Sequence, residues 1–432
     1  MNCENNFYLC EVLCLSEIIV NGGKELSGSI TVQGAKNSVL PILAGTVLCD
    51  GECVINNCPN LSDVETSLKI LSQLGCLCQK QENVVSVNSE NVNSNEIPEN
   101  LMREMRSSVV FLGAIIGRTG KAVISSPGGC ELGPRPIDLH LSALQKLGVE
   151  ITEEHGFLYC NAKNGLIGTE IHLSFPSVGA TENIILAAAT AKGVTVIHNA
   201  AREPEISDLA DFLNSAGARI YGGGSDTVYI HGVKKLHGTV HSIIPDRIAA
   251  VTYMACAAVT GSKIELRNIM PSHMVSMLSL YRESGCNIEV TGKSLVIKAP
   301  QKLKRIPTIR SQVYPGFPTD AGPIVIAMQS VAEGTTVFVE NIFENRFRFV
   351  GELNRMGSKI KVENKVAVIE GVNRLSGANC NCTDLRGGAA LVVAALCANG
   401  QTVIGEISHI LRGYDDIVGT LSSLNADIKI KE

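Results

Sequence analysis

A cysteine in a loop rich in glycine and proline is the first residue of this chain that could do chemistry. Cys130 follows two glycines in the segment 127–136, whose sequence is PGGCELGPRP. A thiol has an ordinary pKa of about 8.5, so it is protonated at neutral pH, and nearby cations can poise it for proton exchange. Loops on a regular scaffold often carry function, and this one offers a side chain little burial. The alternative is a surface excursion without a role.

One carboxylate is a second candidate for chemistry, and five cations could form an anion site. Asp320 follows Phe-Pro-Thr at the predicted start of a helix, where it could also simply interact with the helix dipole. The cations suit phosphate, diphosphate or carboxylate groups. They are Lys36, Arg106, Arg135, Arg386 and Arg412. The alternative for each is that it caps its own helix or pairs with a neighbour.

The elements that must position these residues repeat six times. Each repeat has an apolar helical run, a turn glycine, a β-rich stretch and an amphipathic helix. The separations of the turn glycines are 69, 73, 68, 73 and 66 residues, so the period is about seventy. These glycines are Gly51, Gly120, Gly193, Gly261, Gly334 and Gly400.

A second glycine closes the amphipathic helix of most repeats. It follows the first after 24 residues at Gly75, Gly217 and Gly285 and after 23 at Gly357, and Asn425 takes its place in the sixth repeat. Both residue types tolerate the left-handed conformation of a helix C-terminus. In the second repeat the two glycines, Gly120 and Gly148, are 28 residues apart, and the additional four residues fall in the segment 127–136. That loop is therefore an insertion into a regular scaffold.

The first helix of each repeat is predicted to be buried, because it is apolar nearly all round. These runs are 38–43, 107–116, 184–191, 248–259, 324–331 and 389–398, and each follows polar or charged residues. If three repeats pack around a pseudo-threefold axis, the central helices run parallel. Their unpaired N–H groups and positive dipole ends then gather at one face of each domain and attract anions.

Composition favours a compact two-domain protein. The chain has 432 residues, 45% hydrophobic and 18% charged, and a net charge of -5. A single hydrophobic core rarely supports a chain of this length, so two domains are expected. The sequence has no clustered basic patch of the kind that binds a phosphate backbone, so nucleic-acid binding is not expected. No uncharged apolar run reaches the 18 or more residues of a spanning helix, and residues 1–20 lack the basic start of a signal peptide. We expect a cytoplasmic protein without a membrane role.

Cysteine usage agrees with a reducing compartment. The fifteen cysteines are odd in number and scattered through apolar segments. The pairs Cys76/Cys78 and Cys380/Cys382 each place two thiols on one face of a strand, but no matching histidine cluster accompanies them. We therefore expect no metal and no cofactor.

Seven motifs, found in order along the chain, are specific. They are Gly34-Ala-Lys-Asn37, Met105-Arg-Ser-Ser108, Pro127-Gly-Gly-Cys130 with the segment 135–140, Ala201-Arg-Glu-Pro-Glu205, Phe317-Pro-Thr-Asp320, Phe343-Glu-Asn-Arg346 and Leu411-Arg-Gly-Tyr414. Together they closely resemble the UDP-N-acetylglucosamine 1-carboxyvinyltransferase family, from about Ser16 to the C-terminus.

The resemblance implies an α/β fold (α+β by some schemes): a two-domain inside-out α/β barrel of six βαβαββ repeats, three per domain. It also implies that the chain begins in the second domain, crosses to form the first and returns. The implied domains are 37–244, with the Cys130 loop, and 1–36 with 245–432, and the active site lies in the cleft between them.

The resemblance further implies transfer of the enolpyruvyl group of phosphoenolpyruvate to the 3-hydroxyl of UDP-N-acetylglucosamine. Phosphate leaves through a tetrahedral intermediate, in the first committed step of peptidoglycan synthesis. Cys130 is implied as the acid or as an aid to product release, and Asp320 as the base at the sugar hydroxyl. Lys36, Arg135 and Arg412 are implied to clamp phosphoenolpyruvate.

Further substrate-binding positions follow from the same resemblance. Asn37 and Arg386 are candidates beside the clamp, and Arg346 belongs to the Phe-Glu-Asn-Arg motif. The positions implied for the UDP-sugar are Arg106, Arg135, Pro136, Ile137, Asp138, Leu139, Ser177, Val178, Gly179 and Ile342. Phe175 departs from the family, since some relatives carry a basic residue there, so the uridine contact can differ.

Rival interpretations share parts of this pattern. A 5-enolpyruvylshikimate-3-phosphate synthase has the same architecture and donor but another acceptor, and the Pro-Gly-Gly-Cys loop argues against it. A non-catalytic regulatory paralogue would bind the UDP-sugar without turnover, and a related RNA-terminal phosphate cyclase would need a nucleotide motif. The family resemblance also implies that a small phosphonate epoxide, which mimics phosphoenolpyruvate, alkylates Cys130.

Overall fold

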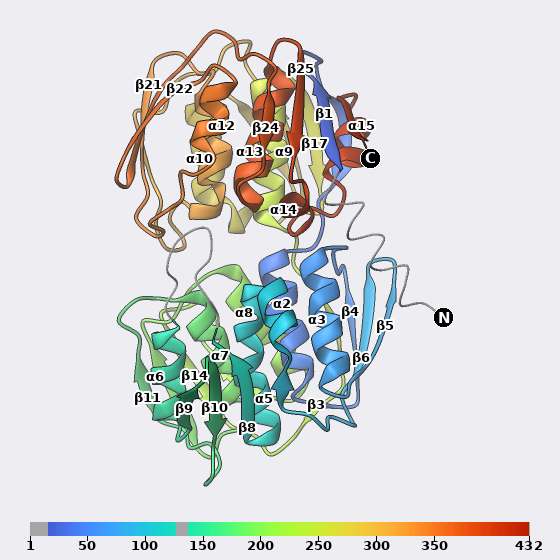
Figure 1. The fold of residues 1–432 in the computed structure, drawn as a ribbon, viewed down its shortest axis with the longest axis vertical. Helices are drawn as coiled ribbons and strands as arrows, with labels where there is room; N and C mark the ends of the chain where they lie inside the picture. The colour runs from blue at the N-terminus through green and yellow to red at the C-terminus, as the bar shows by residue number, and fades with distance from the viewer. Residues whose placement is uncertain (1–15, 127–136, 432) are drawn as a thin grey trace. The chain divides into compact units, whose positions relative to one another are not determined.

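The computed structural model describes residues 16–126 and 137–431, without the side chain of Arg106. The described residues form two compact units. We call residues 34–126 with 137–244 the middle unit, and residues 16–33 with 245–431 the terminal unit. Each unit has its own hydrophobic core. In each, helices occupy the interior and sheets lie around them (Figure 1).

Three four-stranded sheets surround the helices of the middle unit, with the strand orders β16-β4-β6-β5, β7-β8-β10-β9 and β11-β12-β14-β13. The first repeat comprises β16 (Val240–Ser242), α2 (Lys36–Thr46), β4 (Glu52–Asn56), α3 (Ser62–Gln73), β5 (Leu77–Gln81) and β6 (Val84–Asn88). The second comprises β7 (Glu96–Ile97), α4 (Glu99–Glu104), the 3₁₀ helix η1 (Arg106–Val110), α5 (Phe111–Thr119), β8 (Lys121–Ser125), α6 (Asp138–Lys146), β9 (Glu150–Glu154) and β10 (Phe157–Asn161). The third comprises β11 (Glu170–His172), α7 (Val178–Ala188), β12 (Val194–His198), α8 (Pro204–Ser215), β13 (Arg219–Tyr221) and β14 (Thr227–His231). A short parallel pair joins β3 (Cys49–Asp50) to β15 (Leu236–His237).

Three further sheets surround the helices of the terminal unit, with the orders β18-β19-β17-β2, β20-β21-β23-β22 and β24-β25-β1-β26. The fourth repeat comprises β2 (Ser27–Thr31), α9 (Arg247–Val259), β17 (Lys263–Arg267), the 3₁₀ helix η2 (Pro271–His273), α10 (Val275–Glu283), β18 (Asn287–Thr291) and β19 (Ser294–Lys298). The fifth comprises β20 (Thr308–Arg310), the 3₁₀ helix η3 (Thr319–Ala321), α11 (Gly322–Gln329), β21 (Thr335–Val339), α12 (Val350–Arg355), β22 (Lys359–Glu363) and β23 (Val366–Glu370). The sixth comprises β24 (Asn379–Asn381), α13 (Leu385–Cys397), β25 (Gln401–Gly405), α14 (Ser408–Leu411), α15 (Ile417–Ser423), β26 (Asp427–Lys431) and β1 (Glu17–Asn21).

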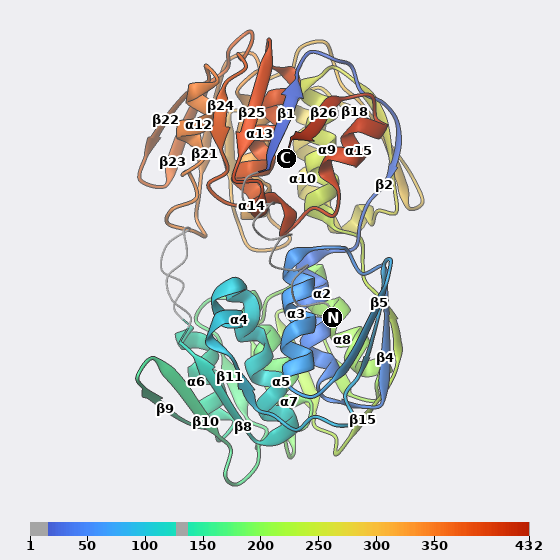
Figure 2. The same ribbon diagram turned by 45° about the vertical axis from the view of Figure 1, so that its right-hand side comes forward.

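Strands from distant parts of the chain complete three of these sheets. β1 lies between β25 and β26 (Figure 2), with Ile18 opposite both Ile404 and Ile430. β2 pairs in parallel with β17, and β16 pairs in parallel with β4. The N-terminal strands therefore belong to the terminal unit, while a strand that follows the third repeat completes the first.

The alternation of residue types explains the layers. Strands such as β12 bury every second residue, while a central helix such as α13 buries eleven consecutive residues from Arg386 to Leu396. Small residues let the central helices approach closely. A Cβ atom on Gly113 of α5 would lie 2.3 Å from the carbonyl oxygen of Asn183 on α7. The predicted fold class, an α/β protein of six βαβαββ repeats, is confirmed.

The repeated glycines occupy positions with positive φ, as the sequence pattern predicts. All six turn glycines have positive φ, from 65° at Gly261 to 121° at Gly51. The residues that close the second helices do too, with φ between 91° and 100° at four of the predicted glycines and 75° at Asn425. A side chain with a Cβ rarely adopts this conformation, so glycine or asparagine is required there.

Two of the predicted helices begin differently from the prediction. The run 107–116 starts as the 3₁₀ helix η1 and becomes α-helical only at Phe111, and a 3₁₀ turn, η3, precedes α11. In the first case two serines and two valines follow one another, and both residue types favour a regular α-helix less than alanine or leucine does.

Candidate active site

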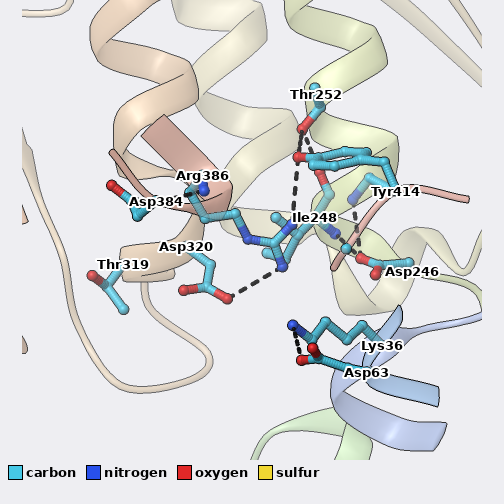
Figure 3. Close-up of polar contacts among 12 residues, drawn as sticks. Lys36, Asp63, Asp246, Ile248, Thr252, Thr319, Asp320, Asp384, Arg386 and Tyr414 are labelled. Atoms are coloured by element: carbon cyan, nitrogen blue, oxygen red, sulfur yellow. Dashed lines mark hydrogen bonds and ion pairs between the residues drawn. The ribbon is translucent and has the colours of Figure 1, made fainter. Parts of the chain in front are cut away.

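Lys36 stands at the first position of α2 in the middle unit. Its Nζ lies 2.7 Å from Oδ2 of Asp63, which belongs to the first turn of α3 (Figure 3). Both side chains are buried, at 10% and 3% exposure. An ammonium group in so little water needs a partner, and Asp63 holds the group in place. The neighbouring Asn37 is exposed.

A second buried carboxylate fixes the same helix start. Asp208 of α8 accepts hydrogen bonds from the hydroxyl of Ser38 and, at 3.2 Å, from the backbone N–H of Ile244. Nε2 of His241 lies 2.9 Å from its other oxygen. Asp208 therefore joins the first turn of α2 to α8 and to the segment that follows β16.

The predicted uridine segment, Ser177–Gly179, begins α7. The hydroxyl of Ser177 accepts a hydrogen bond from the N–H of Ala180, so this residue caps the helix. His140 packs against Gly179, where a Cβ would lie 2.9 Å from the ring carbon Cε1. Asn183 lies with its amide nitrogen 2.9 Å from Nδ1 of His140. Burial lowers the pKa of His140 to about 4, so at neutral pH the ring is uncharged and Nδ1 accepts.

The loop side of this segment is only partly described. Ile137, Asp138 and Leu139 lead into and begin α6, and Asp138 is exposed. Phe175, which departs from the family pattern, is 43% exposed. Cys130, Arg135 and Pro136 lie outside the described residues, as does the side chain of Arg106.

In the terminal unit, Asp320 lies between two buried guanidinium groups. Its Oδ1 is 2.6 Å from Arg346 and its Oδ2 is 3.3 Å from Arg386 (Figure 3 shows the second contact). The arginine side chains are 2% and 3% exposed, whereas Asp320 is 28% exposed. Two cations favour the ionised carboxylate, and the remaining exposure lets it reach a ligand. This geometry suits a base that accepts a proton from a bound hydroxyl.

Arg386 is tied into a chain of hydrogen bonds. Its Nη1 lies 3.4 Å from the hydroxyl of Tyr414, whose oxygen is 2.7 Å from the hydroxyl of Thr252 (Figure 3). Burial opposes the charge of Arg386, but Tyr414, Asp320 and Asp246 outweigh it and raise its pKa. The guanidinium group is therefore permanently charged and fixed between α9 and α13.

The N-terminal ends of α9, α11 and α13 converge on this cluster, as the repeat predicts. Asp320 and Arg386 link the starts of α11 and α13, and Asp246 at the start of α9 acts on Arg386. The prediction of unpaired N–H groups is wrong for two of these three helices, as it is for α7, which Ser177 caps. Asp246 accepts hydrogen bonds from Ile248 and Ala249, and Asp384 accepts them from Arg386 and Gly387. These aspartates cap their own helices.

The predicted acceptor contact Ile342 follows β21. Its backbone N–H donates to the buried carboxylate of Glu340 at 2.7 Å. Arg346 binds the carbonyl oxygen of Thr319 through Nε and Nη2, at 3.2 and 2.9 Å, and its guanidinium lies over the ring of Phe343. Arg346 thus connects the segment after β21 to the residues beside Asp320.

The described residues of the predicted site divide between the two units, and the structure brings Asp320, Arg346 and Arg386 into direct contact. The middle unit holds Lys36, Asn37, Ile137–Leu139 and Ser177–Gly179, and the terminal unit holds Asp320, Ile342, Arg346, Arg386 and Arg412. Arg412 directly follows the short helix α14. Sequence reasoning gave no role to Asp63, Asp208, Glu340 or Tyr414. Tyr414 lay within a motif, whereas no pattern distinguished Asp63 from an ordinary residue at a helix start.

The cysteines Cys380 and Cys382 are protected by burial. Burial raises the pKa of Cys380 to about 11 and of Cys382 to about 12, and both side chains are buried. In residues 16–126 and 137–431 no three His, Cys, Asp or Glu side chains gather as metal ligands do. No helix within these ranges is both long and apolar enough to cross a membrane.

Enolpyruvyl transferases share this architecture. The enolpyruvyl transferase NikO from Streptomyces tendae matches the fold with a TM-score of 0.87 at 24% identity, covering 96% of this chain and 99% of its own. An EPSP synthase from Acinetobacter baumannii matches with a TM-score of 0.75 at 19% identity, and the match covers 96% of this chain and 100% of the synthase. At the level of sequence, the family described as EPSP synthase (3-phosphoshikimate 1-carboxyvinyltransferase) matches residues 20–421.

Two relatives define the branch of this family. UDP-N-acetylglucosamine 1-carboxyvinyltransferase 2 from Caldanaerobacter subterraneus subsp. tengcongensis is 50% identical over 409 residues, 95% of this chain and 98% of the relative. UDP-N-acetylglucosamine 1-carboxyvinyltransferase 1 from Staphylococcus aureus is 44% identical over 418 residues, which are 96% of this chain and 99% of the relative. The chain therefore belongs to the EPSP synthase family and, within it, to the UDP-N-acetylglucosamine 1-carboxyvinyltransferases.

Proposed function

We propose that this protein is a cytoplasmic transferase of peptidoglycan synthesis. It moves the enolpyruvyl group of phosphoenolpyruvate to the 3-hydroxyl of UDP-N-acetylglucosamine and releases phosphate. The names of its relatives support both substrates. The observation that carries the chemistry is the placement of Asp320, a partly exposed carboxylate between two buried guanidinium groups where three helices begin.

The reaction follows as an addition and an elimination. Asp320 takes the proton of the sugar hydroxyl while the oxygen attacks C2 of phosphoenolpyruvate. A proton from the acid, Cys130, goes to the methylene carbon, which gives a tetrahedral intermediate. In the elimination, the Cys130 thiolate takes a proton from the new methyl group while the bond between C2 and the phosphate oxygen breaks, which restores the double bond. The proton held by Asp320 passes to the departing phosphate, so both side chains return to their starting states. Preorganised cations stabilise the negative charge of the donor without reorganisation during the reaction.

The remaining residues bind and orient the substrates. Lys36, Arg135 and Arg412 clamp phosphoenolpyruvate, with Asn37 and Arg386 beside them. Lys36 suits this role because Asp63 already orients its ammonium group. The UDP-sugar contacts are the predicted set: Arg106, Arg135–Leu139, Ser177–Gly179 and Ile342. We place the active site between the predicted domains, 37–244 and 1–36 with 245–432.

A small phosphonate epoxide that mimics phosphoenolpyruvate is expected to be an inhibitor. Its ring opens when a thiolate attacks a ring carbon, so Cys130 would become covalently blocked. The buried cysteines described above offer no comparable target, because burial raises their pKa values.

An acceptor assay separates this function from that of an EPSP synthase. Phosphoenolpyruvate is incubated with either UDP-N-acetylglucosamine or shikimate 3-phosphate, and the products are separated by chromatography and weighed by mass spectrometry. The proposal predicts an enolpyruvyl adduct of the UDP-sugar alone. An adduct of shikimate 3-phosphate alone would assign the other acceptor, and binding of the UDP-sugar without any adduct would indicate a regulatory paralogue.

A further inference from the structure

Three repeats end their central strand in the same way. An asparagine directly follows β4, β12 and β17, with φ between 54° and 56°. Each donates a hydrogen bond from Nδ2 to the carbonyl oxygen of the residue after the neighbouring parallel strand. The contacts are Asn57 to Ile243, Asn199 to Leu173 and Asn268 to Val32, each at 2.8 Å. This clamp holds two parallel strand ends together.

The fifth repeat departs from this pattern by one residue. Its clamp is Asn341, which donates from Nδ2 to the carbonyl oxygen of Ser311 at 2.9 Å. Ser311 follows β20, the strand parallel to β21, so the clamp itself is kept. The position directly after β21, where these three repeats have asparagine, holds Glu340. The scaffold therefore does not need Glu340 for the clamp.

Glu340 is buried, with 1% exposure, and both of its carboxylate oxygens accept hydrogen bonds. Oε1 accepts from the hydroxyl of Ser311 at 2.7 Å and from the backbone N–H groups of Ile342 and Phe343 at 2.7 and 3.0 Å. Oε2 accepts from the hydroxyl of Thr319 at 2.9 Å. Burying a carboxylate is costly unless such donors satisfy it.

These contacts join the two parts of the site in the terminal unit. Thr319 directly precedes Asp320, the proposed base, and Ile342 is the proposed contact of the acceptor sugar. Together with Arg346, which binds Thr319 and Asp320, this carboxylate sets how far the base lies from the acceptor contact. Rates of transfer depend steeply on such a distance, because the reacting groups must be held close to the productive geometry.

We propose that Glu340 is a positioning residue for the transfer, which holds Asp320 at the correct distance from the bound acceptor hydroxyl. It touches neither substrate and acts through Thr319 and Ile342. The inference rests on the proposed function. It adds a residue that sets the geometry between acceptor binding and proton abstraction.

The test shortens the side chain without removing its charge. In Glu340→Asp the carboxylate is drawn back by about 1.5 Å, one carbon–carbon bond, so it cannot reach both Thr319 and Ile342. We expect kcat/KM for UDP-N-acetylglucosamine to fall at least about 30-fold, while KM for phosphoenolpyruvate changes less than about threefold. Glu340→Gln keeps the length, and its amide can donate to the hydroxyl of Thr319, so about wild-type rates should return.

The matched control is Glu406→Asp. Glu406 directly follows β25 in the sixth repeat and is exposed, so the same shortening should leave both substrates unaffected. Should Glu340→Asp not fold, Thr319→Val removes only the contact to Oε2 and keeps the size of the side chain. We then expect kcat to fall while KM for UDP-N-acetylglucosamine is retained.

Three results would overturn the inference. One is wild-type kinetics in Glu340→Asp or Thr319→Val. Another is an equal rise of both KM values with a lowered melting temperature, which indicates a merely structural role. The last is a loss in Glu340→Gln as large as in Glu340→Asp, which would make charge rather than reach decisive. If the wild-type chain itself forms no product, the proposed function fails as well, so the two failures are distinguishable.

Discussion

The exchange Asp320→Asn tests the assignment of the base. It keeps the shape of the side chain but removes the charge and the ability to take a proton. General base catalysis contributes about 100-fold to 10,000-fold, so kcat should fall by this factor, equivalent to about 3–5 kcal/mol in the barrier. Because the base acts in the transition state, KM for UDP-N-acetylglucosamine should change little.

The same exchange has a separate cost in stability. Arg346 and Arg386 remain buried opposite a neutral amide, which can accept a hydrogen bond from only one of them through its oxygen. Removing one partner of a buried pair costs about 3–5 kcal/mol, and the partial exposure of Asp320 brings this toward about 2–3 kcal/mol. A fall of the melting temperature by about 5–10 °C should accompany the loss of rate.

Phosphate release under saturating substrates and a thermal melt measure the two effects. The control is Asp416→Asn, the same exchange at the residue that caps α15, where asparagine is an equally good cap. It should alter neither kcat nor the melting temperature. If Asp320→Asn keeps kcat within about threefold of wild type, Asp320 is not the base and the assignment fails.

Three further predictions address the loop, the charge state and the packing. A phosphonate epoxide should add to Cys130 alone, and Cys130→Asp should keep some turnover while escaping alkylation, since a carboxylic acid can donate a proton; peptide mass mapping that finds the adduct elsewhere would refute this. His140 has its pKa lowered from the ordinary 6.5 to about 4, so the unfolded chain binds a proton that the folded chain does not. The free energy of unfolding should therefore fall as the pH is lowered from about 6.5 to 4, by about 3 kcal/mol at most. Denaturant titrations at several pH values should find that this pH dependence is absent in His140→Gln. Gly113→Ala should destabilise by about 1–3 kcal/mol because its Cβ would press on Asn183, while Gly351→Ala, which meets nothing within 4 Å, should be neutral or stabilising; equal melting temperatures for the two variants would contradict the packing.

Repetition made the fold predictable from sequence. Gly51 and its counterparts mark the points where the backbone must take positive φ, and such a requirement excludes most other residues. The buried helices followed from runs that are apolar on every side. The capping of these helices could not be predicted. An aspartate before a helix, such as Asp246, can bind a ligand or the N–H groups of the helix, and the sequence does not distinguish the two cases.

The site was predictable only where a motif carried it. Asp320 was found through Phe-Pro-Thr-Asp, but its two cationic partners come from positions 26 and 66 residues away, and sequence spacing gives no information on such contacts. Asp63 holds Lys36 across 27 residues in the same way. Glu340 left a detectable signal, a glutamate between the end of β21 and the clamp asparagine Asn341, and comparison of the repeats with one another could have found it.

Release of phosphate from phosphoenolpyruvate, measured with and without UDP-N-acetylglucosamine on the wild-type chain and on Cys130→Ala, tests the central claim most directly. The account predicts steady release by the wild type only when the UDP-sugar is present, with one enolpyruvyl adduct per phosphate, and a strong reduction in Cys130→Ala. Release at the same rate without the sugar, or none with both substrates saturating, would contradict it.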